Sequence, residues 1–266
     1  MAGPPLRLLT IAGSDSGGGA GIQADLKAFA KAGAHGMSAI TAVTAQNTSE
    51  VTAVYPMPPE AIVEQVRAVA RDIGVDAVKI GMVGNAEAIQ AVAVALDLVG
   101  EAPVVLDPVM VAESGARLLD EDATEALRTL LVAQATVVTP NLAEAAALGD
   151  GAAADDPEQL ARAVHALGPA AVVVTGGHRD DATDVFFDGE RLEPIPGERH
   201  PDGAAHGSGC THSSTLAAAL AAGADTLDAA RQAKRVASAA VEHGLSCLGA
   251  GAGPVDVLGL TRVRAG

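Results

Sequence analysis

The sequence predicts an α/β fold built around a mostly parallel sheet that helices cover on both faces. Short apolar runs alternate along the chain with segments of helical periodicity, which is the order of elements typical of such a sheet. The apolar runs are continuous, as expected for strands that are buried on both sides. No repeat of about 20–50 residues recurs, so a solenoid is not expected. The stretch at 149–156 is interpreted as a surface loop, and we therefore expect a single domain over residues 1–266.

The first half of the chain contains clear local patterns. Its apolar runs predict strands at 6–12, 37–45, 51–55, 77–80 and 104–106. Helices are predicted at 20–31 and 86–98. Another helix begins at Pro58 and Pro59, because proline suits the first helical turn, and one of its faces carries Ile62, Val66, Val69 and Ile73.

The second half of the chain continues the alternation. Further strands are predicted at 137–139, 171–175, 183–187 and 191–195, and the turn Asp188-Gly189-Glu190 joins the last two into a hairpin. Helices are predicted at 122–131, 142–148, 157–167, 211–222 and 227–243. Ligands of parallel α/β sheets bind at the carboxyl ends of the strands, and the glycine-rich and polar motifs of this chain follow predicted strands.

Composition limits the classes of partner. The formal net charge is −16, and without a basic patch such a chain repels polyanions, so we expect no nucleic-acid partner. No apolar run reaches the ~18 residues of a membrane span and no secretory signal is seen, so we expect a cytoplasmic protein without a membrane partner. Lysine occurs only at Lys27, Lys31, Lys79 and Lys234. This acidic, lysine-poor composition fits a salt-rich cytoplasm or a GC-rich genome, and we favour the first.

A glycine-rich stretch, 13–21, follows the first predicted strand. It has neither the spacing of a dinucleotide fingerprint nor the Gly-Lys-Ser/Thr end of a P-loop, so we interpret it as a backbone platform for a small flat ligand. Asp15 and Asp25 add carboxylates; the alternative is a tight turn with a capping residue. Gln46 closes the next strand. Its amide can donate and accept hydrogen bonds in one plane, as recognition of an aminopyrimidine edge requires, and the alternative is an ordinary polar loop residue.

Two polar motifs follow later strands. Asp107 and Glu144 are candidates to organise a magnesium ion through its waters, although Asn141 and Glu144 also fit a helix capping box. Thr175-Gly176-Gly177-His178 follows the next strand and is a candidate phosphate loop.

The stretch from Ala205 to His212 leads into an Ala- and Leu-rich helix. Glycines allow close approach, and the first N–H groups of a helix lack internal partners, so this turn predicts an anion site. The positive end of the helix dipole at this turn favours a thiolate, and we therefore expect the pKa of the Cys210 thiol to be lowered. The alternative is a glycine loop that enters a buried helix, with Cys210 as core filler.

Six motifs occur together and in order: the segment 15–25, Ala45-Gln46-Asn47-Thr48, Lys79-Ile80-Gly81-Met82, Asp107-Pro108-Val109-Met110, Thr139-Pro140-Asn141 and His206-Gly207-Ser208-Gly209-Cys210-Thr211. Together they resemble the hydroxymethylpyrimidine/phosphomethylpyrimidine kinases of thiamine biosynthesis, in the ribokinase-like superfamily, over essentially the whole chain. The resemblance implies a three-layer αβα fold, ATP as co-substrate and Mg²⁺. It also implies two successive phosphorylations, of 4-amino-5-hydroxymethyl-2-methylpyrimidine and then of its monophosphate. We separately expect a homodimer.

The resemblance implies roles for individual residues as well. Those that would hold the pyrimidine or line its pocket are Gln46, Asp25, Gly13, Met82 and Val109. Those that would serve the nucleotide are Asp107, Thr139, Asn141, Glu144, Thr175 and Gly177. Asp107 and Glu144 would also hold the metal. Cys210 would stand where ribokinase-like relatives place a catalytic Asp, above an anion hole formed by Gly207, Ser208, Gly209 and Cys210.

Two positions depart from the pattern of the relatives. Thr175 and Glu113 stand where many relatives carry lysine, which removes positive charge near the expected polyphosphate and puts nucleotide affinity in doubt. The alternatives are a pyridoxal or pyridoxine kinase and a non-catalytic pyrimidine or nucleotide sensor. A cysteine hydrolase or transferase is weaker, because no His–Asp or His–Asn partners for Cys210 are evident.

Overall fold

The strands of the computed structural model, which describes residues 3–112, 114–149, 155–177 and 181–260, form a nine-stranded sheet in the order β3-β2-β1-β4-β5-β6-β7-β8-β9. The strands are β1 (Arg7–Asp15), β2 (His35–Gln46), β3 (Val51–Pro56), β4 (Ala77–Ile80), β5 (Val104–Leu106), β6 (Val137–Val138), β7 (Ala171–Val174), β8 (Asp184–Phe187) and β9 (Leu192–Ile195). The strands from β2 to β7 in this order are parallel, whereas β3 at one edge and the β8–β9 hairpin at the other are antiparallel. The predicted α/β class is confirmed.

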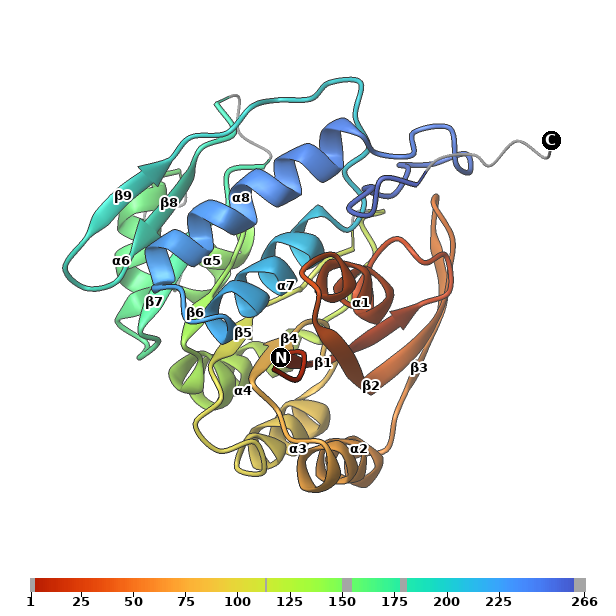
Figure 1. Cartoon of the computed structure of the whole chain (residues 1–266), viewed down its shortest axis with the longest axis vertical. Helices are drawn as coiled ribbons and strands as arrows, with labels where there is room; N and C mark the ends of the chain where they lie inside the picture. The colour runs from red at the N-terminus through yellow and green to blue at the C-terminus, as the bar shows by residue number, and fades with distance from the viewer. Residues whose placement is uncertain (1–2, 113, 150–154, 178–180, 261–266) are drawn as a thin grey trace.

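Helices cover both faces of the sheet (Figure 1). One layer contains α1 (Gly21–Lys31), α7 (Ser208–Ala221) and α8 (Thr226–Glu242). The other contains α2 (Pro59–Asp72), α3 (Ala86–Leu96), α5 (Leu142–Leu148), α6 (Pro157–His165) and the irregular segment 121–134. The three-layer αβα arrangement is therefore also confirmed.

Two apolar clusters explain why the strand runs are continuous. Along β1, Leu8 packs in the cluster beneath α1 and α7, whereas Leu9 and Ile11 pack in the cluster on the opposite face. Successive side chains of a strand point to opposite faces, so a strand buried on both sides needs apolar residues at every position. The alanines of α7 and α8 let these two helices pack closely over the sheet.

Most predicted elements differ from the structure by one or two residues at their ends, and three differ in form or by a longer extension. The helix expected at 122–131 is a chain of short pieces, 3-10 at Glu121–Ala123, α4 at Thr124–Ala126, a π-helical turn at Leu127–Leu131 and 3-10 at Val132–Gln134. Within it the Thr129 hydroxyl donates to the Glu125 carbonyl (2.8 Å), a contact that bends helices. Strand β1 continues past its predicted end at Ala12, and α7 begins at Ser208, before the predicted Thr211. In the part of the chain that the structure describes, no helix has both the length and the apolar character needed to cross a membrane.

Candidate active site

A cavity of about 390 Å³ opens at the carboxyl edge of the parallel strands, where ligands of this fold class bind. Most of the predicted site residues line it: Gly13, Gln46, Met82, Asp107, Val109, Thr139, Asn141, Glu144, Thr175, Gly177, Gly207, Ser208, Gly209 and Cys210. They come from loops far apart in sequence, and the parallel topology is what brings them together. Glu113 and His178 lie outside the described residues.

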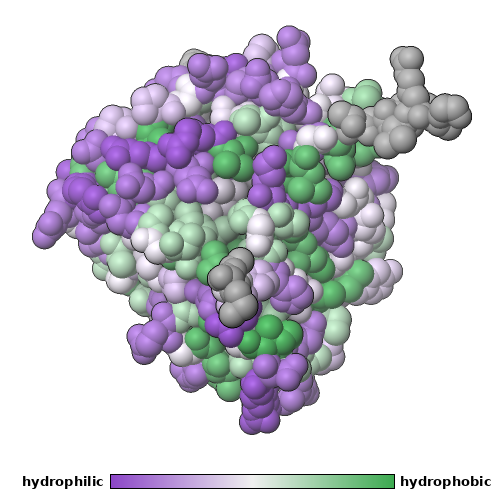
Figure 2. Space-filling view, viewed as in Figure 1, coloured by the Kyte–Doolittle hydropathy of each residue, from purple (hydrophilic) through white to green (hydrophobic). Residues whose placement is uncertain are grey.

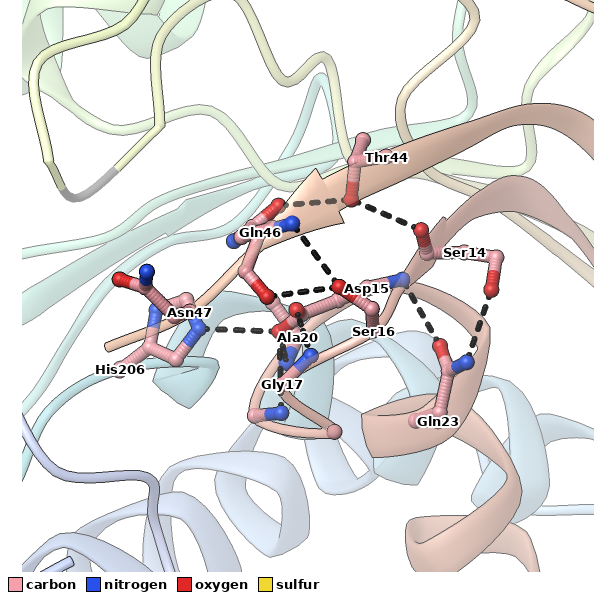
Figure 3. A network of polar contacts seen from close by, with 12 residues as sticks. Ser14, Asp15, Ser16, Gly17, Ala20, Gln23, Thr44, Gln46, Asn47 and His206 are labelled. Carbon is pink, nitrogen blue, oxygen red and sulfur yellow. Dashed lines mark hydrogen bonds and ion pairs between the residues drawn. The ribbon is translucent and has the colours of Figure 1, made fainter. Parts of the chain in front are cut away.

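Asp15 organises the glycine-rich loop at one end of the cavity (Figure 3). Its carboxylate accepts hydrogen bonds from the backbone N–H groups of Gly17 (2.7 Å), Gly19 (3.0 Å) and Ala20 (2.8 Å). It also lies 3.1 Å from His206 Nε2. Burial acts to raise the pKa of Asp15, but the His206 and backbone hydrogen bonds outweigh it, and the pKa lies below its usual value. Asp15 and His206 therefore tie the glycine loop to the residue that precedes the anion hole. For this loop the sequence left open a ligand platform or a tight turn with a capping residue, and Asp15 caps the turn. The contact with His206, 191 residues away, was not predicted.

Gln46 closes β2 and faces the same end of the cavity. Its backbone N–H donates to Ser16 Oγ (2.8 Å), and its side-chain Oε1 lies 3.1 Å from Thr44 Oγ1. The single Thr44 hydroxyl proton also faces the Ser14 carbonyl (2.9 Å), so one proton is shared between two acceptors. Thr44 thus holds the plane of the Gln46 amide while leaving hydrogen-bonding capacity toward the cavity.

Asp25 does not line this cavity. Its side chain is fully buried, and its oxygens are occupied by Lys79, Thr10 and Ser214. The expectation that Asp25 touches the pyrimidine does not fit this placement. The reason is local: Asp25 lies on the inward face of α1, which packs on the sheet beneath the loop.

Asp107 and Glu144 both line the cavity, and both are nearly buried. Asn141 and Glu144 form the predicted capping box, in which the Asn141 N–H donates to Glu144 Oε2 (2.9 Å) and the Glu144 N–H to Asn141 Oδ1 (2.9 Å). Burial, and next the Asp107 charge, raise the pKa of Glu144 to about 8. Burial also raises the pKa of Asp107, against the effect of Lys79.

Two like-charged carboxylates that face one cavity are a donor set that a hard divalent cation fits. The described residues contain no cluster of three or more His, Cys, Asp or Glu side chains placed around a metal position. A Mg²⁺ ion would therefore be held by Asp107 and Glu144 with water and substrate oxygens as its other ligands, which is common for this ion.

The first turn of α7 forms the floor of the cavity. Gly207 is its N-cap with φ +84°, and a Cβ there would overlap the Gly19 carbonyl oxygen, so the position requires glycine. The Ser208 N–H donates to the Ala205 carbonyl (2.9 Å). The amides of Gly207, Gly209 and Cys210 have no acceptor among the described residues, so three of the four expected anion-hole donors remain for a ligand.

Cys210 lines the cavity, but the expected lowering of its pKa is wrong. Burial raises the pKa of the Cys210 thiol to about 12, although the Lys79 ammonium acts in the opposite direction. Desolvation of the thiolate therefore outweighs the field of the helix N-terminus, and the thiol is protonated at neutral pH.

The part of the cavity that Thr175 and Gly177 line contains cations that were not predicted from the sequence. Lys234 on α8 lines the cavity next to Thr175 and pairs with the buried Asp184 (2.6 Å), which also accepts the Gly176 N–H (2.8 Å). Arg199 lines the cavity too, and its guanidinium donates to the Gly177 carbonyl (3.3 Å). The rarity of lysine was the available signal for Lys234, because a lysine retained in a lysine-poor chain deserves a structural explanation.

A three-layer αβα sheet with amides unpaired within the described residues at the N-terminus of α7 and buried carboxylates at one strand edge is the arrangement of a ribokinase-like kinase of small molecules. The description "Phosphomethylpyrimidine kinase" belongs to a family model that matches residues 15–256. A hydroxymethylpyrimidine/phosphomethylpyrimidine kinase of Rhizobium meliloti is 49% identical over 253 residues, covering 93% of this chain and 95% of that one. The chain thus belongs to the phosphomethylpyrimidine kinase family and is a phosphotransferase.

Solved structures agree with this assignment. The pyridoxal kinase from Staphylococcus aureus in complex with ADP matches with a TM-score of 0.88 and 33% identity, over 96% of this chain and 94% of that chain. A phosphomethylpyrimidine kinase from Clostridium difficile matches with a TM-score of 0.76 and 39% identity, over 86% and 96%. Because both kinds of vitamin kinase share the fold, the acceptor has to be argued from the cavity.

Proposed function

We propose that this kinase transfers the γ-phosphoryl group of ATP to the hydroxymethyl group of 4-amino-5-hydroxymethyl-2-methylpyrimidine, and then phosphorylates the monophosphate to the diphosphate. The observation that carries the proposal is the position of the first turn of α7. Gly207 contacts the glycine loop at Gly19, and a Cβ on Gly209 would lie 3.8 Å from Asp107 Oδ2. The first turn of α7 therefore lies against the glycine loop and close to Asp107, which supports a role for this turn between acceptor and phosphates.

Each part of the cavity has a role in this reaction. The Gln46 amide would pair with the aminopyrimidine edge, and Gly13, Met82 and Val109 would pack on the ring. A Cβ at Gly13 would lie 2.6 Å from Met82 Cε, so glycine leaves room for the Met82 side chain. The free amides of the α7 turn would stabilise the charge of the transferring group, since phosphoryl transfer depends mainly on positioning and electrostatics. Cys210 would orient the acceptor hydroxyl or take its proton.

ATP would lie toward Thr139, Asn141, Thr175 and Gly177, with Lys234 supplying positive charge that Thr175 lacks. Mg²⁺, when bound, would neutralise charge on the phosphates. The carboxylates of Asp107 and Glu144 would hold it, and binding would require Glu144 to lose the proton that its raised pKa lets it carry.

The acceptor is tested by incubating the enzyme with Mg-ATP and either the hydroxymethylpyrimidine or pyridoxal, with products identified by mass. A buried polar group left unpaired costs roughly 1–3 kcal/mol, so we expect kcat/KM for pyridoxal to be about 10- to 100-fold lower. Equal or better use of pyridoxal would instead assign a pyridoxal kinase. Binding of the pyrimidine without any phosphorylated product would assign a sensor.

The homodimer and the cytoplasmic location are also proposals. Val43, Val54 and Tyr55 on β2 and β3 are exposed large apolar side chains at the sheet edge, and Tyr55 is 62% exposed. In Figure 2 the surface over α8 and the β8–β9 hairpin is largely hydrophilic, while hydrophobic residues are visible on the side where β2 and β3 lie. We expect a dimer mass in light scattering and a monomer for Tyr55→Lys; a monomeric wild type would contradict this. ATP as co-substrate and the free cysteines Cys210 and Cys247 support a reducing cytoplasm.

A further inference from the structure

A fully buried ion pair lies beneath the cavity. Lys79 Nζ on β4 is 2.9 Å from Asp25 Oδ1 and 3.1 Å from Oδ2, and both side chains are 0% exposed. Asp25 also accepts hydrogen bonds from Thr10 Oγ1 of β1 (2.6 Å) and Ser214 Oγ of α7 (2.7 Å). One carboxylate on α1 therefore links β1, β4 and α7.

The pair is not explained by stability alone. Removing two charges from water costs more than their attraction usually returns, and apolar side chains of similar volume often serve a core equally well. An apolar cluster on this face of the sheet includes residues of β1, β4, α1 and α7, and apolar side chains in place of the pair would extend it. A buried pair retained at this place points to a role in the site above it.

The geometry indicates what that role is. Ser214 lies one helical turn after Cys210 on α7, so its bond to Asp25 fixes the turn that carries the anion hole. The charge of the pair acts on the site as well: the Lys79 ammonium lowers the pKa of the Cys210 thiol more than the Asp25 carboxylate raises it, although burial has the largest effect. A Cβ on Gly81 would lie 2.7 Å from Lys79 Nζ, so glycine leaves room for the ammonium.

We propose that the Asp25–Lys79 ion pair is a positioning element for phosphoryl transfer, which fixes the first turns of α7 and holds a buried ammonium under the anion hole. The inference rests on the kinase function proposed above. Neither residue touches the substrate. Lys79 acts through Cys210 and the anion-hole amides, and Asp25 acts through Lys79 and Ser214.

The main test is the neutral double variant Lys79→Met/Asp25→Asn, which keeps side-chain length and a hydrogen-bonding partner for Thr10 and Ser214. The control is Arg7→Gln/Asp76→Asn. It neutralises the ion pair between Arg7 of β1 and Asp76 just before β4, and neither residue lines the cavity. At a temperature where both are folded by circular dichroism, we expect kcat of the first to fall about tenfold or more with KM for the acceptor within about threefold, because misplaced groups raise the barrier. The control should keep wild-type kcat. A kcat within about threefold of wild type in the folded neutral variant would overturn the proposal, and a raised KM alone would return Asp25 to direct substrate contact.

A milder pair of variants decides the matter if the double variant does not fold. Ser214→Ala removes one bond to Asp25, whereas Thr215→Val removes a neighbouring hydroxyl that bonds only within α7, to the Thr211 carbonyl (2.7 Å). We expect about threefold or more loss of kcat for Ser214→Ala and none for Thr215→Val. Equal kcat values for the two would overturn the proposal.

Alkylation of Cys210 separates this inference from the proposed function. In a Cys247→Ser background only Cys210 carries a thiol, and iodoacetamide should modify it more slowly in the neutral double variant, because the ammonium that favours thiolate is gone. An unchanged rate contradicts the inference. If the wild type phosphorylates no acceptor, the proposed function fails while the alkylation rates still test the ion pair.

Discussion

Replacing Cys210 with Ala removes the thiol from the first turn of α7 and asks whether it takes the acceptor proton. With a pKa of about 12, thiolate makes up only about one molecule in 10⁴ at pH 8, because the ionised fraction falls tenfold for each pH unit below the pKa. If thiolate is the base, the wild-type rate should therefore rise about tenfold per pH unit from pH 7 to 9 without levelling. A thiol with the lowered pKa expected from the helix field would level off in this range.

The size of the loss follows from the role. General-base catalysis is usually worth about 10²–10⁴-fold, so kcat of Cys210→Ala should fall by that factor and its pH profile should lose the steep rise. Cys210→Asp should recover part of the activity, since a carboxylate stands at this place in relatives. The assay is single-turnover transfer at saturating Mg-ATP and acceptor, with a thermal melt to establish that each variant is folded. A rate for Cys210→Ala within about threefold of wild type at pH 8 would remove Cys210 from the mechanism. A level wild-type profile would exclude thiolate as the base and leave Cys210 only the orienting role.

Two further predictions concern stability. With a net charge of −16, screening should relieve repulsion between surface carboxylates, so the melting temperature should rise from low to molar KCl; no rise would favour codon bias as the cause of the composition. Gly207→Ala should lower the free energy of unfolding by about 2–4 kcal/mol, because a Cβ meets the Gly19 carbonyl in addition to the strain of φ +84°, whereas Gly33→Ala, at φ +76° in open space, should cost only about 1 kcal/mol in a denaturant titration. Equal losses for the two alanines would show that the Gly19 contact is unimportant.

Much of the fold could be predicted because buried parallel strands carry a strong local signal. Ala77–Ile80 and Val104–Leu106 were predicted with the bounds that the structure has, since every residue in them is apolar or lies between apolar ones. The segment 121–134 was not predictable in detail, because its apolar pattern is helical while its hydrogen bonding changes from 3-10 to α to π. Hydrophobic periodicity indicates which side of a segment is buried. It does not indicate which carbonyl group each backbone N–H donates to.

The site was predictable where a loop follows a strand and less so where a partner comes from afar. Gln46, Asp107 and Glu144 follow strands and do line the cavity. The position of Asp25 was misjudged because the inward direction of a helix residue depends on how the helix lies on the sheet. The pKa of Cys210 was misjudged because the field of a helix terminus is visible in the sequence, whereas the desolvation that outweighs it depends on packing.

The net charge of the chain says little about how it would hold a polyphosphate. Three of the four lysines lie at or near the cavity. Lys27 donates to the Gly18 carbonyl of the glycine loop (2.7 Å), Lys79 pairs with Asp25, which is bonded to α7, and Lys234 lines the cavity. Each makes a specific contact that a shorter or uncharged side chain would lose. The surface can therefore become strongly acidic while the cavity keeps its cations and its oriented amides. Local placement of charge in a partly buried site outweighs distant surface charge, because salt screens exposed charges over about 10 Å and buried ones far less.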